Sequence, residues 1–309
     1  MKATGKHINL RLLEVFVAVV RHQGYARAQH ELNLTVSAIS NYMSELEDRL
    51  GYVLCQRGRS GFALTPKGEQ FLQHSLRLLS EMEQFERQSD ALKGDAGGTF
   101  RMGVIDATAN DPDLALPQLV GRFNEQFPAV HLNLMIRSPH DLLMGIQDNQ
   151  LDLAVGSFPF RVSNVIEVPL YREQHWLYCS DQHPLFAQGK LNLPLVTQYG
   201  IVTRSYWSSA DLGEKGFKRS TATVDNMEAQ LILILSGKYV GYLPEHYAHS
   251  LLKEGRLRVL MPNEFGYQAE FSAIFRRGRS KEPFIRAMRE MLKSQIRKKS
   301  RGVRNALGS

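Results

Sequence analysis

Residues 9–50 constrain the fold of this 309-residue chain more than any other stretch, because they contain three short helical patterns separated by tight turns. Apolar residues recur at helical spacing from Leu10 to Val20, after a potential N-cap at Asn9. Gly24 interrupts the pattern, and a second helix is expected over residues 25–32. A few residues later Thr35 can cap a third helix over residues 36–50. Two helices joined by a turn this short predict a helix-turn-helix.

The third helix combines an apolar stripe with an unusual polar face. Its buried stripe is expected to consist of Ile39, Met43, Leu46 and Leu50. The opposite face presents Val36, Ser37, Ser40, Asn41 and Ser44. Short hydroxyl and amide side chains can approach base edges in the major groove of DNA, whereas an ordinary solvated face carries Lys and Glu. A DNA-reading helix is therefore favoured over the alternative of a plain exposed surface.

A β-hairpin and a long helix follow this helix. Residues 53–57 and 62–64 are strand-like and are joined by residues 58–61, which predicts a hairpin with Arg57 and Arg59 near its tip. Arginines in that position can contact phosphate or enter a minor groove. Thr65 and Pro66 then suit the N-cap and first position of a helix that extends to about residue 92. The N-terminal domain is thus expected to be a winged helix-turn-helix.

Residues 12–72 resemble the winged helix-turn-helix of LysR-type transcriptional regulators. The matching residues are Phe16-Val17-Ala18-Val19, Arg27-Ala28, Ala38-Ile39-Ser40, Leu46-Glu47, Leu50-Gly51, Leu54, Arg57 and Leu64-Thr65-Pro66-Lys67-Gly68. The length and order of the remaining chain fit the same family. The chain departs from the common family pattern at Gly24, Gln29 and Asn41. The expected DNA-binding residues are Arg27, Thr35, Val36, Ser37, Ser40, Asn41, Arg57 and Arg59.

The long helix over residues 66–92 carries an apolar stripe that no short domain nearby could cover. Phe71, Leu78, Met82 and Phe85 lie on this stripe, and Leu72, Leu76 and Leu79 widen it. Such a helix is expected to pair with a second copy of itself, although packing within its own chain is an alternative. The resemblance supports pairing, because related regulators dimerise through this linker helix. Two recognition helices about 34 Å apart would then read a partly palindromic site.

The basic charge of the chain lies mostly at its C-terminal end. The formal net charge is +7, yet residues 276–309 hold 12 Lys and Arg against 2 Asp and Glu. A solvated basic tail over residues 301–309 is expected, with non-specific contact to DNA as the less favoured interpretation. No run of 18 apolar residues occurs, and the first apolar stretch is amphipathic, so we expect a cytoplasmic protein without membrane contact. Cys55 and Cys179 fall in different expected domains, which disfavours a disulfide framework.

Beyond a glycine-rich hinge at residues 93–99 the pattern changes to alternating strands and helices. Strands are expected at residues 100–105, 130–136, 151–156, 165–170, 176–179, 200–202, 222–224, 240–243 and 267–275, and helices at residues 114–127, 139–149, 226–236 and 283–296. The first of these form a β-α-β-α-β order, which predicts a mostly parallel sheet covered on both faces. The return of a strand near residue 267 suggests two subdomains joined by two crossovers, near 161–166 and 263–268. The resemblance implies the same architecture, a periplasmic-binding-protein-like α/β effector domain.

The expected domains are therefore a winged helix-turn-helix at 1–65, a linker helix at 66–93 and an effector domain at 94–300. Subdomain I would comprise about residues 98–162 and 267–300, and subdomain II about residues 163–266. Ligands of open α/β sheets bind beyond the carboxyl ends of strands and near helix N-termini. Loops at those positions, together with the resemblance, select Asp106, Thr108, Asn110, Ser138, Phe158, Thr203, Arg204, Trp207 and Asn226 as effector-binding candidates.

Several of these candidates have a purely structural interpretation. Thr108 and Ser138 could cap the following helices, and Phe158 could belong to the core. Arg204 favours an anionic effector, whereas Asp106 favours an amine or a hydroxyl donor, or pairs with Arg204. The charge of the effector therefore stays open.

The function expected from these patterns is that of a DNA-binding transcriptional regulator switched by a small-molecule inducer. Its expected partners are double-stranded DNA, a further copy or copies of itself in a dimer or tetramer, and RNA polymerase if it activates transcription. The alternative is a solute-binding protein without a regulatory role. No P-loop, dinucleotide fingerprint, HExxH or nucleophile elbow occurs, so neither enzyme activity nor a cofactor or metal is expected.

Overall fold

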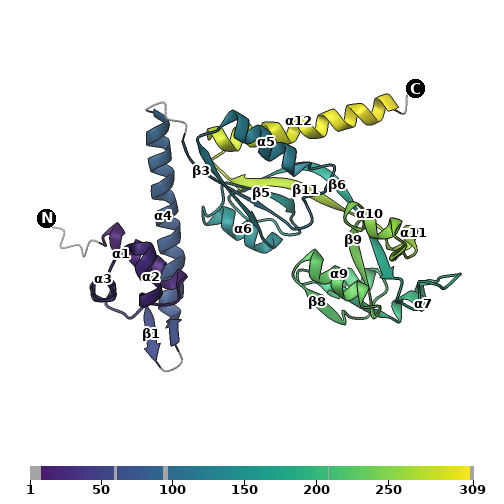
Figure 1. Ribbon diagram of the computed structural model, residues 1–309, viewed down its shortest axis with the longest axis horizontal. Helices are drawn as coiled ribbons and strands as arrows, with labels where there is room; N and C mark the ends of the chain where they lie inside the picture. The colour runs from purple at the N-terminus through teal and green to yellow at the C-terminus, as the bar shows by residue number, and fades with distance from the viewer. Residues whose placement is uncertain (1–7, 59–60, 93–96, 208, 307–309) are drawn as a thin grey trace. The chain divides into compact units, whose positions relative to one another are not determined.

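The computed structural model describes residues 8–58, 61–92, 97–207 and 209–306 of the chain. The chain divides into two compact units, which are described separately (Figure 1). The N-terminal unit comprises residues 1–97 together with residues 148–150, and the C-terminal unit comprises residues 98–147 and 151–309. Hinge residues 93–96 lie outside the described part.

The N-terminal unit begins with the three expected helices, α1 (Leu10–Arg21), α2 (Tyr25–Leu32) and α3 (Val36–Leu50). The predicted caps are confirmed, because the side chain of Asn9 accepts a hydrogen bond from Arg11 N and that of Thr35 accepts one from Ala38 N. Asn33, in the left-handed conformation at φ 51°, closes α2 and allows the tight turn into α3. The helix-turn-helix thus follows from local capping signals.

The hairpin and the linker helix complete this unit. Strands β1 (Cys55–Gly58) and β2 (Gly61–Leu64) pair antiparallel, and α4 runs over Pro66–Leu92. Thr65 caps α4 through Gly68 N and donates a hydrogen bond to the carbonyl of Val53. Glu47 Oε1 accepts the backbone N–H of Leu54 at 2.6 Å, which ties α3 to the start of the wing. The wing is therefore fixed to both neighbouring helices.

Helices α1, α2 and α3 and the first turns of α4 enclose a single core (Figure 1). Among its fully buried members are Phe16, Ile39, Met43, Leu46 and Leu54.

The C-terminal unit is an α/β domain. Its strands are β3 (Gly98–Val104), β4 (Val130–Ile136), β5 (Leu153–Ser157), β6 (Val165–Ser180), β7 (Gly200–Arg204), β8 (Ala222–Val224), β9 (Tyr239–Pro244), β10 (Leu257–Val259) and β11 (Tyr267–Arg276). Its helices are α5 (Leu116–Gln126), α6 (Pro139–Gln147), α7 (Leu193–Thr197), α8 (Ser209–Glu214), α9 (Met227–Leu235), α10 (Glu245–Lys253), α11 (Pro262–Phe265) and α12 (Pro283–Ala306).

In the part of the chain described, these strands form one sheet in the order β4-β3-β5-β11-β6-β9-β7-β8, with β10 paired to β6. The parallel pairing expected for the β-α-β-α-β segment is confirmed for β3 with β4 and β5, and β7 also pairs in parallel with β8 and β9. Strands β6 and β11 pair antiparallel with each other and with their neighbours. The sheet as a whole is therefore mixed, because the two crossover strands run in opposite directions.

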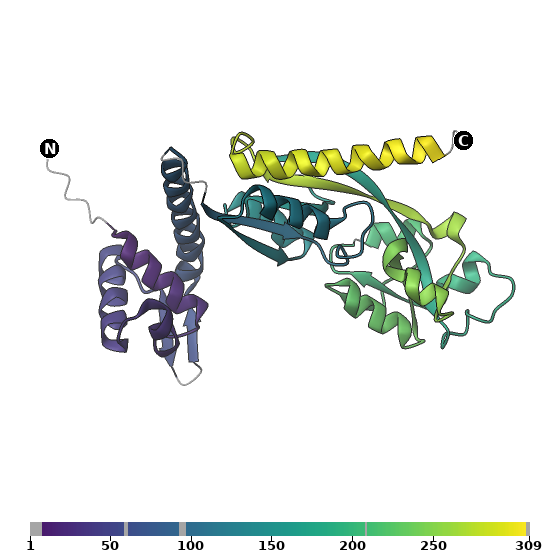
Figure 2. The same ribbon diagram turned by 45° about the horizontal axis from the view of Figure 1, so that its top comes forward.

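The two crossovers are the long strands β6 and β11, which lie side by side from one subdomain to the other (Figure 2). The expected strands at 165–170 and 176–179 are one continuous strand. Side chains from Val165 to Tyr171 pack on the core of subdomain I, and Leu177 and Cys179 belong to a core of subdomain II. The change of core thus falls later along β6 than the expected boundary at residue 163.

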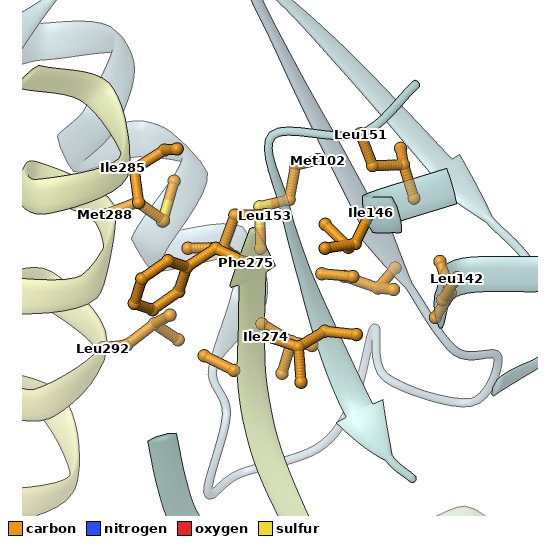
Figure 3. Close-up of a cluster of buried hydrophobic side chains, with 14 of the residues drawn as sticks. Met102, Leu142, Ile146, Leu151, Leu153, Ile274, Phe275, Ile285, Met288 and Leu292 are labelled. Carbon is orange, nitrogen blue, oxygen red and sulfur yellow. The ribbon is translucent and has the colours of Figure 1, made fainter. Parts of the chain in front are cut away.

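Subdomain I has helices on both faces of its sheet. Figure 3 shows Ile285, Met288 and Leu292 of α12 directed at Phe275 of β11, with Leu142 and Ile146 of α6 on the other side of the strands. Helix α12 continues to Ala306, where a separate tail was expected from residue 301. Its Lys- and Arg-rich sequence contains no proline after Pro283, so nothing local stops the helix.

Both cysteines are buried, and they do not form a disulfide with each other. Burial raises the pKa of the Cys179 thiol to about 12, so the thiol is protonated near neutral pH. We expect that Cys179 of the native protein does not react with DTNB at pH 8 but reacts fully in guanidinium chloride. Mass mapping of the labelled peptide measures this, and rapid native labelling of Cys179 would contradict the buried position.

Candidate nucleic-acid interface and effector cleft

The polar face of α3 is open to solvent in the N-terminal unit. Thr35, Val36, Ser37 and Asn41 are exposed, and Ser40 is half-buried at the edge of the core. Thr35 Oγ1 and Ser37 Oγ lie 3.0 Å apart and share a hydrogen bond. The arrangement can present hydroxyl and amide groups to base edges.

The predicted arginines differ in how far the structure describes them. Arg27 is exposed on α2 and donates from Nη2 to the carbonyl of Gln23 at 2.8 Å. Arg57 lies on β1 opposite Phe62 in the hairpin register. Arg59 lies outside the described residues. Their roles on DNA stay predictions.

One part of the apolar stripe of α4 is packed against its own unit, and another part is exposed. The ring of Phe71 lies 5.5 Å from that of Phe16, and Leu72, Leu76 and Leu79 also pack on the core of their own unit. Further along the helix, the side chains of Leu78 and Phe85 are 45% and 64% exposed, and Met82 is half-buried. The part of the stripe that could meet a second copy therefore begins near Leu78.

A cavity of about 600 Å³ lies between the two subdomains of the C-terminal unit. Its walls come from the loops after β3, β5 and β7 and from the crossover strands β6 and β11. Aromatic rings line much of it, namely Phe158, Tyr206, Trp207, Tyr267 and Phe271. A cleft of this size with aromatic walls suits a small organic molecule.

An ion pair crosses the cleft. Arg204 Nη2 and Nη1 lie 2.8 Å and 3.2 Å from the two carboxylate oxygens of Asp106. Asp106 also accepts the backbone N–H of Met227, the first residue of α9, where the helix dipole favours a negative charge. Of the alternatives considered for Asp106, the pairing with Arg204 is the one that the structure contains. Each Nη atom of Arg204 donates one of its two N–H groups to Asp106.

Most of the other predicted effector residues lie in several different cavities. Phe158 and Trp207 line the same cleft as Asp106 and Arg204, while Thr203 donates to Ser220 Oγ at 2.7 Å and lines a small cavity behind it. Thr108 and Asn226 line a neighbouring apolar groove, and Asn226 also caps α9.

Two predicted residues lie away from the cleft wall. Asn110 lines a separate hollow beside His246. Ser138 caps α6 through Asp141 N at 3.2 Å and lines none of these cavities.

A buried cluster at the hinge of the cleft had no signal in the sequence. Glu173 Oε2 lies 2.6 Å from His175 Nε2, and its Oε1 lies 3.6 Å from His246 Nδ1. His246 Nε2 donates to the carbonyl of Ala107 at 2.8 Å, which joins α10 of subdomain II to the β3 loop of subdomain I. These residues are scattered over three segments, so only the fold brings them together.

The tyrosines of the cleft remain neutral. Burial raises the pKa of Tyr206, although the adjacent Arg204 guanidinium opposes this effect. Burial also raises the pKa of Tyr267, which is stacked on His175 with the ring centres 4.8 Å apart. The cleft therefore offers phenol groups as donors and aromatic faces. Within the described ranges no group of three His, Cys, Asp or Glu side chains could hold a metal ion, and no helix is apolar and long enough to span a membrane.

Comparisons with known proteins agree with this two-part organisation. Residues 10–69 match the model of the bacterial regulatory helix-turn-helix protein, lysR family, and residues 93–297 match the LysR substrate binding domain. The chain is 33% identical over 274 residues to the HTH-type transcriptional activator BauR of Pseudomonas aeruginosa, covering 88% of this chain and 90% of BauR.

Solved structures of full-length regulators share the fold. The LysR family transcriptional regulator CbnR has a TM-score of 0.65 at 20% identity, covering 94% of this chain and 99% of CbnR. A full-length OxyR variant from Pseudomonas aeruginosa has a TM-score of 0.59 at 22% identity, covering 94% and 95% of the two chains. A winged helix-turn-helix joined to an effector-binding domain defines a DNA-binding transcriptional regulator. The chain belongs to the LysR family of these regulators.

Proposed function

We propose that this regulator reads its DNA site with the polar face of α3 and changes its activity when a small molecule binds in the cleft between the effector subdomains. The exposed, short side chains on α3 are the observation that carries the DNA half of the proposal. Ser37, Ser40 and Asn41 contact base edges, and Arg27, Arg57 and Arg59 bind phosphate or a groove and set the register.

The effector half rests on the 600 Å³ cavity and on the contacts that cross it. Asp106 and His246 both join the β3 loop of subdomain I to subdomain II. A ligand that prefers one spacing of the subdomains shifts the population toward that spacing, and the paired DNA-binding units then change their separation or the bend they impose. A solute-binding protein without a regulatory role is not favoured, because the same chain carries the helix-turn-helix.

Pairing through α4 presents two recognition helices to one operator. Leu78, Met82 and Phe85 support this, since an exposed apolar stripe on a long helix is covered well by a second copy. The structure of full-length CbnR complexed with its target DNA shows that a related fold, with a TM-score of 0.65, binds DNA. We propose a dimer or a tetramer, action on DNA in the cytoplasm, and contact with RNA polymerase where the outcome is activation.

The proposal is tested by the double substitution Ser40→Ala with Asn41→Ala. Each lost base contact costs about 1–3 kcal/mol of discrimination, so we expect specific binding to fall at least tenfold while non-specific binding is unchanged. A gel shift compares the region upstream of the chain's own gene with a scrambled duplex at fixed salt. Non-specific affinity depends on phosphate contacts, which the substitutions leave in place.

The matched control is Gln73→Ala, an exposed neutral amide on α4. This variant should bind both duplexes as the unmodified protein does. Unchanged discrimination in the double variant would show that this face of α3 does not read the bases.

A further inference from the structure

Three residues with an unpaired buried polar atom line one small cavity behind the aromatic wall of the cleft. The atoms are Arg204 Nε, Gln230 Oε1 and the Tyr242 hydroxyl, and none has a hydrogen-bond partner among the residues that the structure describes. Their residues are only 5%, 2% and 3% exposed. All three line the same cavity of about 10 Å³. Buried polar groups are normally paired, so three unpaired groups around one cavity indicate a missing partner.

The hydrogen-bonding role of each atom is fixed by its other contacts. Arg204 donates to Asp106 from its Nη atoms, and its Nε–H can only act as a donor. Gln230 Nε2 donates to the backbone carbonyl of Tyr242 at 2.6 Å, which leaves Oε1 as an acceptor. Burial raises the pKa of Tyr242, so its hydroxyl keeps its proton and can donate. The cavity therefore presents two donors and one acceptor.

This set matches the hydrogen-bonding capacity of a hydroxyl group. A hydroxyl oxygen accepts from Arg204 Nε–H and from the Tyr242 O–H, and its own proton goes to Gln230 Oε1. A carboxylate would place an acceptor against Gln230 Oε1, and an ammonium would place a donor against Arg204 Nε–H. A cavity of about 10 Å³ is just large enough for one water molecule.

The cavity adjoins the effector cleft. Arg204, Tyr206, Trp207, Met227 and Tyr267 line both spaces. The ring of Tyr242 lies 5.2 Å from that of Trp207 and 5.2 Å from that of Tyr267, so these rings pack together at the edge of the cavity. A ligand in the cleft whose ring packs on these side chains can extend one small polar group into the cavity.

We propose that this cavity is a hydroxyl-binding site, which holds one water molecule in the free protein and the hydroxyl of an uncharged alcohol or phenol when the effector is bound. The inference rests on the proposed effector cleft and names the class of its ligand. The carboxylate of Asp106 balances the charge of Arg204, so this pair adds no net charge beside the cavity.

A crystal structure of the full-length protein at about 1.8 Å tests whether the cavity holds one water molecule in the free protein. We expect one ordered oxygen within hydrogen-bond distance of Arg204 Nε, Gln230 Oε1 and the Tyr242 hydroxyl. Absence of that oxygen, or direct pairing among the three groups, would overturn the site.

Calorimetric titration with benzyl alcohol, benzylamine and benzoate tests whether the site prefers a hydroxyl. These probes share a ring and differ in their polar group. We expect benzyl alcohol to bind most tightly. Its affinity should fall roughly three- to tenfold in Tyr242→Phe, the effect of one neutral hydrogen bond. Gln230→Met provides a second variant that removes the acceptor at similar volume. Tyr247→Phe is the matched control, since Tyr247 lines the neighbouring groove and not this cavity.

Tighter binding of benzoate or benzylamine, no binding of benzyl alcohol, or an unchanged affinity in both variants would overturn the ligand class. Sequence-specific DNA binding is measured on the same samples. If sequence-specific DNA binding persists when the hydroxyl preference fails, the DNA-reading half of the proposed function stands and this inference falls.

Discussion

Asp106→Ala is expected to lower the free energy of unfolding of the C-terminal unit by about 3–5 kcal/mol, the cost of breaking a buried ion pair. The side chain of Arg204 is only 5% exposed, and the substitution leaves its guanidinium without a counter-charge. It also removes the acceptor for Met227 N at the start of α9. Both partners of Asp106 lie in subdomain II, so the same change loosens the contact between the subdomains.

Tryptophan fluorescence during urea unfolding measures this effect selectively, because both tryptophans, Trp176 and Trp207, lie in the C-terminal unit. The matched control is Glu270→Gln. Glu270 pairs with Arg172 at 2.9 Å, but these side chains are 72% and 66% exposed, so this loss should be below about 1 kcal/mol. If both substitutions lower the free energy of unfolding equally, the buried Asp106–Arg204 pair contributes no more than an exposed ion pair.

Gly68→Ala is expected to destabilise the N-terminal unit by about 3 kcal/mol, at the upper end of the usual cost of overpacking. A Cβ atom at this position would lie 2.1 Å from the carbonyl oxygen of Leu54 and 3.2 Å from Leu64 Cδ2. The carbonyl belongs to the backbone at the base of the wing, so it cannot rotate away as a flexible side chain could. Relief requires α4 to move from the wing, and we expect specific DNA binding to weaken with it.

Far-UV circular dichroism records the unfolding of both units, whereas tryptophan fluorescence records only the C-terminal one. Gly68→Ala should therefore shift the unfolding transition seen by circular dichroism and leave the transition seen by tryptophan fluorescence unchanged. Gly121→Ala is the control, because a Cβ atom at this exposed helical glycine of α5 meets nothing within 4 Å. Alanine there should stabilise the helix by about 0.5–1 kcal/mol. A destabilised Gly121→Ala, or an unaffected Gly68→Ala, would contradict the close approach of α4 to the wing.

Features whose physical cause lies within a few residues were determined by the sequence alone. The caps at Asn9 and Thr35, the proline at the start of α4 and the apolar periodicity of α1 and α3 are local interactions, and each appears in the structure as expected. The family resemblance depends on the same local motifs, which is why the domain order was also predictable.

Features that join distant segments were decided only by the tertiary structure. Asp106 and Arg204 are 98 positions apart, and their pairing depends on the crossing of β6 and β11, which no local pattern encodes. The same holds for Gly68, whose lack of a side chain is explained by a backbone oxygen on another element. The apolar stripe of α4 looked uniform in the sequence, yet Phe71 is packed in its own core and Phe85 is exposed. Periodicity shows which side of a helix is apolar, whereas only the packed fold determines which neighbour covers it.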